Sequence, residues 1–200
     1  MVSFRILFAS ALAITASIAA KSEPAQIVED LNTLTQKSKA LMTPVSSVST
    51  VNGPLIIIGR GPFPKIIRGF TDIVSNATTY IDQISKMADV AAGAPSNDVF
   101  DAYRKFASTH QTLLDLLTSK AELFNTVPLI GEPVAAVLRQ DEKVIDTLTF
   151  ALISKVLSYG AEIGKQAEPL DKALTTCIEA YKGLSLKKRS LRFARREIEA

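Results

Sequence analysis

The chain has 200 residues and a formal net charge of +3, with 23 basic residues, 20 acidic residues and a single histidine. Arg5 contributes +1 and residues 187–200 contribute +4, which leaves a charge of about −2 for the rest of the chain. This body therefore lacks the basic stripe that nucleic-acid binding requires, and the lone Cys177 excludes an internal disulfide.

The N-terminal segment has the layout of a secretory signal peptide. Arg5 supplies a short positive region, residues 6–18 are apolar or small, and small residues precede a cleavage point after Ala19 or Ala20. The apolar run is shorter than the roughly 20 residues that a membrane-spanning helix needs. We therefore expect residues 1–20 to be removed and the protein to be secreted, either extracellular or associated with the cell wall. The alternative is an amphipathic first helix, which the all-round apolar character disfavours.

Five further stretches repeat apolar residues at the three- and four-residue steps of an amphipathic helix. They cover residues 24–41, 65–93, 95–124, 133–159 and 163–184. Short loops join them and strand signals are few, which favours an all-α fold. The spacing predicts an antiparallel bundle of about five amphipathic helices, forming one domain over residues 21–185.

Proline, glycine and charge define the expected breaks in this pattern. The first helix should stop before Pro44, and Pro169 is a possible kink in the last one. The apolar run at residues 55–58 fits a short strand or a helical turn equally well. Residues 186–200 are basic and lack a core face, so we expect a flexible tail there.

No recognisable catalytic or metal-binding motif is present in the sequence. It contains neither a Gly-x-Ser-x-Gly elbow nor a His-Glu-x-x-His zinc helix, and one His with one Cys cannot build a structural zinc site. His110 is the only histidine base that an unrecognised hydrolase would have. It lies on an apolar helix face, so we interpret it as a hydrogen-bonded packing residue. We predict no enzymatic activity, no metal and no cofactor.

Several single residues carry a second interpretation besides packing or solvation. Cys177 occupies an apolar helical position and should be buried, the alternative being a thiol that pairs between chains. Asn76 begins the only N-glycosylation sequon and can face solvent. Arg189 ends a dibasic pair that is a plausible processing site. The acidic pairs at residues 29–30 and 141–142 are interpreted as solvated charges on polar helix faces.

The apolar stripes are long enough to enclose a ligand as well as to form a core. A mainly apolar pocket with a few polar groups is how small ligands are usually held. The candidate lipid-binding residues are the large apolar side chains of these stripes and the polar groups beside them: Phe70, Tyr80, Ile84, Tyr103, Phe106, His110, Leu113, Leu117, Phe124, Leu148 and Leu152.

The segment 120–138, KAELFNTVPLIGEPVAAVL, carries a family resemblance. It places Lys120 and Phe124 at the end of a helix, then a Pro128-Leu129 turn with Gly131, then a helix that opens on small and apolar residues. This segment resembles the fungal hydrophobic surface-binding protein A family, which includes cell-wall galactomannoproteins. The order of helices and linkers agrees over about residues 24–184. The run at 55–58, the insert at 60–64, the cysteine and the basic tail depart from the family pattern.

The resemblance implies a secreted fungal helical protein that binds hydrophobic surfaces or, as mannoprotein relatives do, fatty acids and other lipids. The partners would then be lipids or hydrophobic surfaces, with the fungal cell wall as a further one. The alternative is a structural or antigenic cell-wall mannoprotein with a simply packed core and no ligand. The basic tail in place of a Ser/Thr-rich stalk weakens the case for covalent attachment to the wall.

Overall fold

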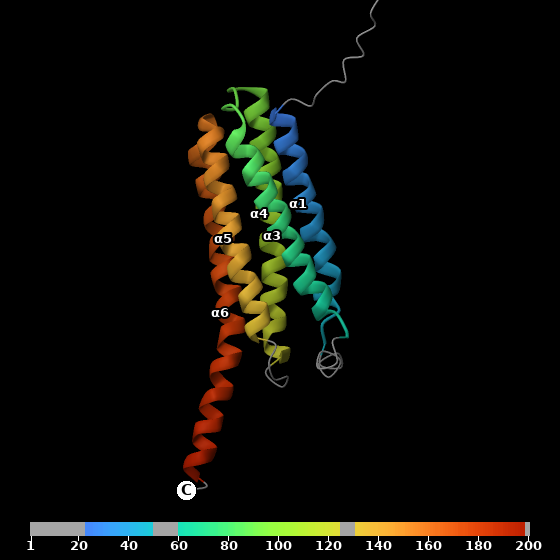
Figure 1. Cartoon of the computed structure of the whole chain (residues 1–200), viewed down its shortest axis with the longest axis vertical. Helices are drawn as coiled ribbons and strands as arrows, with labels where there is room; N and C mark the ends of the chain where they lie inside the picture. The colour runs from blue at the N-terminus through green and yellow to red at the C-terminus, as the bar shows by residue number, and fades with distance from the viewer. Residues whose placement is uncertain (1–22, 50–59, 125–130, 199–200) are drawn as a thin grey trace, which may run out of the picture.

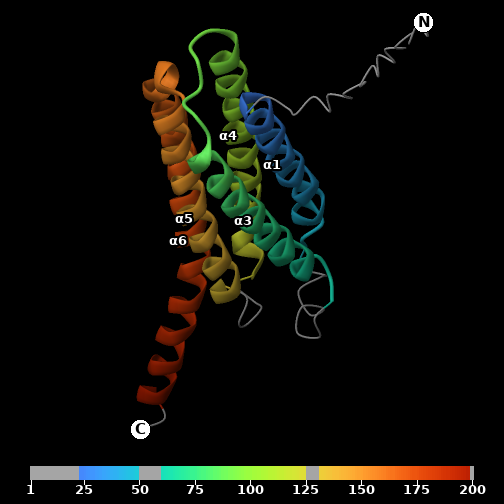
Figure 2. The same ribbon diagram turned by 45° about the horizontal axis from the view of Figure 1, so that its top comes forward.

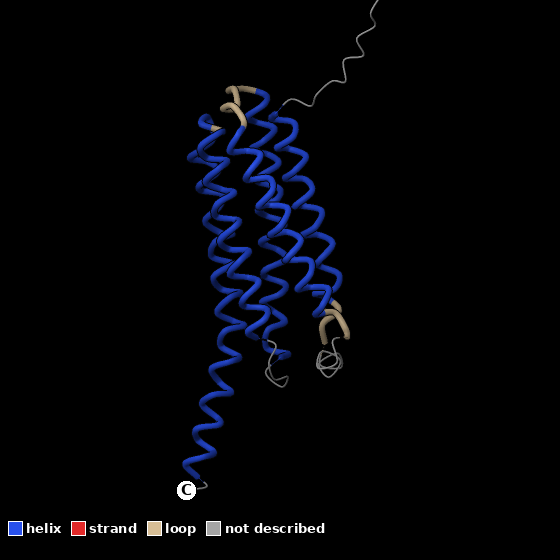
Figure 3. The backbone as a smooth tube through the Cα atoms, viewed as in Figure 1, coloured by secondary structure: helices blue, strands red, loops and turns tan. Residues whose placement is uncertain are grey.

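The computed structural model describes residues 23–49, 60–124 and 131–198, with side chains described up to Lys182 except that of Phe124. The predicted signal peptide with its cleavage residues Ala19 and Ala20, and the apolar run at residues 55–58, lie outside the described residues. Nearly all of the described chain is helical (Figure 3).

Five long helices confirm the all-α prediction. They are α1 (Glu23–Ser46), α3 (Phe63–Lys86), α4 (Ala94–Lys120), α5 (Gly131–Lys155) and α6 (Gly160–Ile198). Two short 3₁₀ helices, η2 (Ala121–Phe124) and η3 (Leu157–Tyr159), follow α4 and precede α6. Successive long helices run in opposite directions (Figure 1), as expected for short connections between helices.

The helices close a ring around a common interior. The extensive helix contacts are α1 with α3, α3 with α5, α5 with α6, α6 with α4, and α4 with α1. Each helix therefore has two main neighbours, and α4 and α5 face one another across the ring rather than side by side. Figure 2 shows the same arrangement from a second direction. Side chains of α4 and α5 that meet must do so in the interior of the bundle.

The apolar stripes seen in the sequence are the faces that the helices turn toward this interior. Ile27, Leu31 and Leu34 of α1 are at most 1% exposed, and the corresponding stripes of the other four helices are buried with them. Burying apolar surface contributes about 25 cal/mol per Å², so these faces are the main source of stability. At the α1–α3 contact, a Cβ on Gly69 would lie only 2.8 Å from Leu41 Cγ, so glycine is needed for this close approach.

Two helix ends differ from the sequence prediction. Helix α1 continues past Pro44 to Ser46, because Pro44 removes only its own N–H from the helix, and the Ser47 N–H after it still donates to the Thr43 carbonyl at 3.1 Å. Helix α3 ends at Lys86 and does not continue toward Gly93. The chain after it is extended at Met87, and the Val90 N–H donates to the Lys155 carbonyl at 2.7 Å. The contact of Val90 with the end of α5 therefore replaces a further turn of α3.

Residues 186–198, where we expect a flexible tail, continue helix α6, and the flexibility of this segment stays a prediction. Helix α6 runs without interruption through Pro169 and on to Ile198, and its last turns project beyond the other four helices (Figure 1). Pro169 is exposed and produces no break in the helix. Residues 187–198 still carry six basic residues and one acidic residue, so the projecting segment is a strongly basic helix.

Candidate functional site

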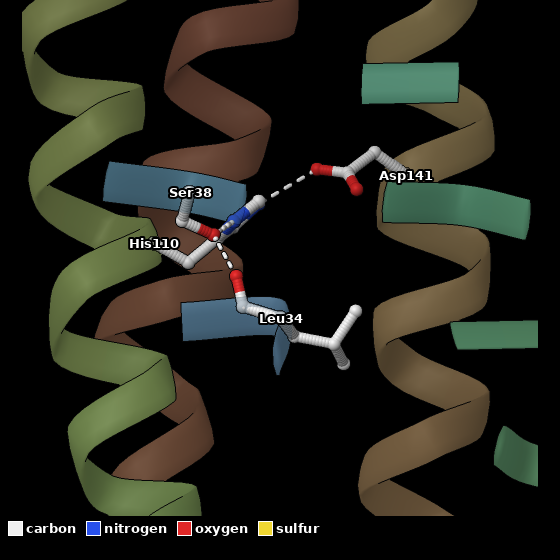
Figure 4. Close-up of polar contacts among 4 residues, drawn as sticks. All are labelled: Leu34, Ser38, His110 and Asp141. Carbon is white, nitrogen blue, oxygen red and sulfur yellow. Dashed lines mark hydrogen bonds and ion pairs between the residues drawn. The ribbon is translucent and has the colours of Figure 1, made fainter. Parts of the chain in front are cut away.

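A polar centre formed by Ser38, His110 and Asp141 lies inside the otherwise apolar ring (Figure 4). These residues come from α1, α4 and α5, and all three side chains are 0% exposed. His110 Nδ1 is 2.9 Å from Ser38 Oγ, and His110 Nε2 is 2.8 Å from Asp141 Oδ2. The histidine thus joins α1 to α5 across the interior, between two helices that are not neighbours of one another in the ring.

The hydrogen bonds around His110 fix how protons are shared in the polar centre. The Ser38 hydroxyl donates to the Leu34 carbonyl at 2.9 Å, so its oxygen accepts from the Nδ1–H of His110. The contact between Nε2 and Asp141 Oδ2 then holds one proton, whichever of the two atoms carries it. The His–Asp pair has no net charge in either case, which makes its burial physically reasonable.

One acceptor of the polar centre has no hydrogen-bond partner among the described residues. Asp141 Oδ1 is buried and receives no hydrogen bond from them, although Oδ2 of the same carboxyl group is bonded to His110. An unsatisfied buried acceptor typically costs about 1–3 kcal/mol. Groups of this kind are rare in native structures, so each one calls for an explanation.

A second polar bridge crosses the ring closer to the N-terminus of α4. The hydroxyl groups of Tyr103 on α4 and Thr149 on α5 are 2.9 Å apart, and both side chains are buried. Burial raises the pKa of Tyr103, and the hydrogen bond with Thr149 opposes that shift in part. The interior therefore offers two polar positions, both contributed by the facing pair α4 and α5.

The prediction that the acidic pairs are solvated is wrong for one member of each pair. Asp141 is 0% exposed and Asp30 is 4% exposed, whereas Glu29 is exposed and Glu142 is partly buried. Asp30 Oδ1 accepts a hydrogen bond from Gln26 Nε2 at 2.8 Å. The apolar spacing contains the signal that sequence reasoning missed, because Asp141 follows Leu138 by three residues and precedes Ile145 by four.

The structure brings most of the candidate lipid-binding residues together in the ring interior. The buried ones are Phe70, Ile84, Tyr103, Phe106, His110, Leu113, Leu117, Leu148 and Leu152. The rings of Phe70 and Phe106 lie 6.0 Å and 5.5 Å from the His110 ring, so aromatic side chains flank the polar centre. Tyr80 is only partly buried and donates to Asn76 Oδ1 at 3.3 Å. The side chain of Phe124 is outside the described residues.

A cavity of about 450 Å³ lies at the end of the bundle where α1 finishes and α3 begins. It is lined by Thr43, Pro44, Ser47, Gly61, Pro62 and Lys65. Its volume falls within the usual range of about 300–1,000 Å³ for small-ligand pockets. Its α1 lining begins five residues after Ser38, which corresponds to about 7.5 Å along a helix axis. The pocket opens on the surface, on the same half of α1 as the polar centre, and most of its lining residues are exposed.

Cys177 is a free, buried thiol on α6, as predicted. Burial raises the pKa of this thiol to about 12, and the nearby Asp141 adds to the shift. We expect the thiol to resist Ellman's reagent at pH 8 in the folded protein, because only the thiolate reacts. In denaturant it should react within minutes. Equal labelling rates in the two states would contradict this account and would support a thiol available for pairing between chains.

The two predicted modification sites lie on helices. Asn76 is in α3, partly buried, and its side-chain amide donates to the Asp72 carbonyl at 2.6 Å. Arg189 is in the projecting part of α6, where the backbone is helical. Glycosylation at Asn76 and cleavage after Arg189 both remain predictions.

The polar centre contains the residue types of a serine hydrolase but not their working arrangement. A nucleophilic serine passes its proton to the histidine, whereas the Ser38 hydroxyl donates to the Leu34 carbonyl. Within the described residues, no group of three or more His, Cys, Asp or Glu side chains is placed to hold a metal ion. The geometry favours a structural or ligand-facing role for these residues over nucleophilic catalysis.

No described helix is by itself long and apolar enough to cross a membrane. One pair, Gly131–Lys155 with Leu157–Lys182, meets the requirements of length and composition jointly, with a bend of 110° between its members.

Comparison with solved structures finds the same fold in three chains, each solved in complex with a fatty acid. AFMP4P in complex with palmitic acid superimposes with a TM-score of 0.69 and 19% identity, covering 79% of this chain and 99% of the other. Ligand binding domain 1 of Penicillium marneffei MP1, complexed with arachidonic acids, superimposes with a TM-score of 0.66 and 12% identity. The match covers 80% of this chain and 97% of that domain. Ligand binding domain 2 of the same protein, complexed with multiple arachidonic acids, superimposes with a TM-score of 0.65 and 11% identity. The match covers 80% of this chain and 95% of that domain.

No protein-family model and no curated protein sequence matches the chain. At these identities the likeness to the solved domains is a likeness of fold: a complete helical ligand-binding domain corresponds to about four-fifths of this chain.

Proposed function

We propose that this protein binds a long-chain lipid, such as a fatty acid, in the interior of its helical ring. The observation that carries the proposal is the shared fold, because nearly the whole length of each solved domain, crystallised with palmitic or arachidonic acid, corresponds to this chain. Fold alone does not determine function, so the proposal also depends on what this chain's own interior offers.

The interior has the chemistry that an acyl chain requires. Apolar faces of all five helices line it, and each buried methylene of a ligand contributes about 0.8 kcal/mol. The open pocket between the ends of α1 and α3 is the entrance that we propose for the acyl chain. Two polar bridges between α4 and α5 provide the few polar groups that orient a ligand in a mainly apolar site.

Secretion and wall association are part of the same proposal. The signal-peptide layout at residues 1–20 and the resemblance to the hydrophobic surface-binding protein A family support a secreted, non-enzymatic fungal protein. A lipid-binding domain outside the cell must hold its ligand away from water, and a closed ring of helices without disulfides is suited to that task.

A structural mannoprotein with a filled core is the second candidate. It is favoured by the hydrogen bonds from Tyr103 to Thr149 and from His110 to Asp141, which tie α4 to α5 across the interior. In that case the polar bridges would only stabilise the bundle, and no lipid would displace side chains from the core.

Native mass spectrometry of delipidated protein with palmitate distinguishes the two candidates. We expect at least one palmitate per chain to be retained if the interior binds lipid, and none if the core is simply filled. The double variant Phe150→Ser/Leu157→Ser is the matched control, because both side chains are 70% exposed and would contribute only to adsorption on the outer surface. Loss of palmitate in this variant would contradict binding in the interior.

A further inference from the structure

We infer that the polar centre selects the head group of the bound lipid, and that it favours a hydroxyl group over a carboxylate. The ligand class would be neutral, hydroxyl-headed lipids such as long-chain alcohols. The inference rests on the proposed lipid-binding function and concerns the orientation and chemistry of the ligand within that same interior.

The hydrogen-bond donors of the polar centre are all in use. The Ser38 hydroxyl donates to the Leu34 carbonyl, and the Nδ1–H of His110 donates to Ser38 Oγ. The remaining proton lies between His110 Nε2 and Asp141 Oδ2. A carboxylate has only acceptor atoms, so it would find no donor here without breaking one of these bonds.

The polar centre has one hydrogen-bond acceptor that is not in use. Within the part of the chain that the structure describes, Asp141 Oδ1 receives no hydrogen bond, although the side chain is 0% exposed. A hydroxyl head group supplies the missing donor. A carboxylate has no hydrogen to offer this oxygen and would place acceptor atoms against it in the apolar interior. The centre therefore favours hydroxyl heads over carboxylates.

The position of this oxygen also fits a ligand that enters along the ring. In Figure 4 the unpartnered oxygen of Asp141 points away from His110, on the side where the Leu34 side chain reaches toward α5. Leu34 is 0% exposed and belongs to the apolar core. A head group bonded to Oδ1 would thus be followed by apolar surroundings suited to an acyl chain.

Binding of hexadecanol, palmitate and hexadecyl methyl ether to the delipidated full chain tests the inference. We expect wild-type protein to bind hexadecanol about tenfold more tightly than palmitate or the ether, a ratio typical of one hydrogen bond to an acidic group. The ether keeps the chain and the oxygen but lacks the donor, so this comparison needs no variant protein. Isothermal titration calorimetry or fluorescence displacement provides the three dissociation constants.

Asp141→Leu is the matching protein variant. It removes the Oδ1 acceptor and keeps a side chain of similar size, so hexadecanol should lose its roughly tenfold advantage over hexadecyl methyl ether. Asp146→Asn is the control on the same helix, because Asp146 is exposed and should leave the ratio unchanged. Circular dichroism before each titration verifies that the variants are folded.

The outcomes separate this inference from the function on which it rests. If palmitate binds wild-type protein as tightly as hexadecanol, or if the ether binds as tightly as the alcohol, the inference is overturned and lipid binding stands. An unchanged preference for hexadecanol over the ether in folded Asp141→Leu also overturns it. If none of the three probes binds, the proposed function fails as well.

Discussion

Replacing His110 by leucine is expected to lower the free energy of unfolding by about 3–5 kcal/mol, the usual cost of removing one partner from a buried ionisable pair. The substitution keeps most of the side-chain volume, so packing changes little. It leaves the Asp141 carboxyl group without a hydrogen bond from the described residues, because Oδ1 has none and Oδ2 loses its bond with His110. Urea unfolding monitored by circular dichroism measures the change.

The double variant His110→Leu/Asp141→Leu controls for packing. It removes the buried acceptor together with its partner, and apolar replacement of a whole buried pair is often nearly neutral. We expect it to recover most of the lost stability and so to be more stable than His110→Leu alone. Stability losses that simply add in the double variant would show that the two residues do not act as a pair.

Replacing Phe106 by alanine should lower the free energy of unfolding by a similar amount, about 3–5 kcal/mol, because it removes a large side chain from a closely packed interior. Phe106 is 0% exposed on α4, and its ring lies 5.5 Å from that of His110. The substitution therefore removes apolar contacts and also one wall of the polar centre. The same urea titration provides the measurement.

Phe150→Ala is the matched control for this loss. It removes the same atoms from α5, but the side chain is 70% exposed, so the expected change is within about 0.5 kcal/mol. If the two alanine variants were equally stable, Phe106 could not be part of a closely packed core, and the interior assigned to the ring would be wrong.

The helical fold was predictable because its signal is repeated in every segment. Apolar residues at three- and four-residue steps recur over five stretches, and all five became long helices. The boundaries were less predictable where tertiary contacts decide them. Nothing local to Met87 indicates that the chain leaves α3 to place Val90 against the end of α5. The basic residues after 186 likewise lack a core face, yet the backbone continues as helix.

The polar centre was only half predictable. His110 stood out as the single histidine on an apolar face, and its role as a buried, hydrogen-bonded residue is confirmed. Its partners did not stand out, because Ser38 and Asp141 are common residues that are usually solvated. Their positions within the apolar spacing were readable, but which helices face one another across the ring was not. That arrangement depends on the order in which the five helices stand around the ring.

A crystal structure of the delipidated protein soaked or co-crystallised with hexadecanol tests the central claim most directly. The account predicts an acyl chain inside the ring, in contact with Phe106 and Leu34, with its hydroxyl group donating to Asp141 Oδ1. A chain bound only on the outer surface near Phe150, or an interior still filled by side chains at saturating ligand, would contradict it.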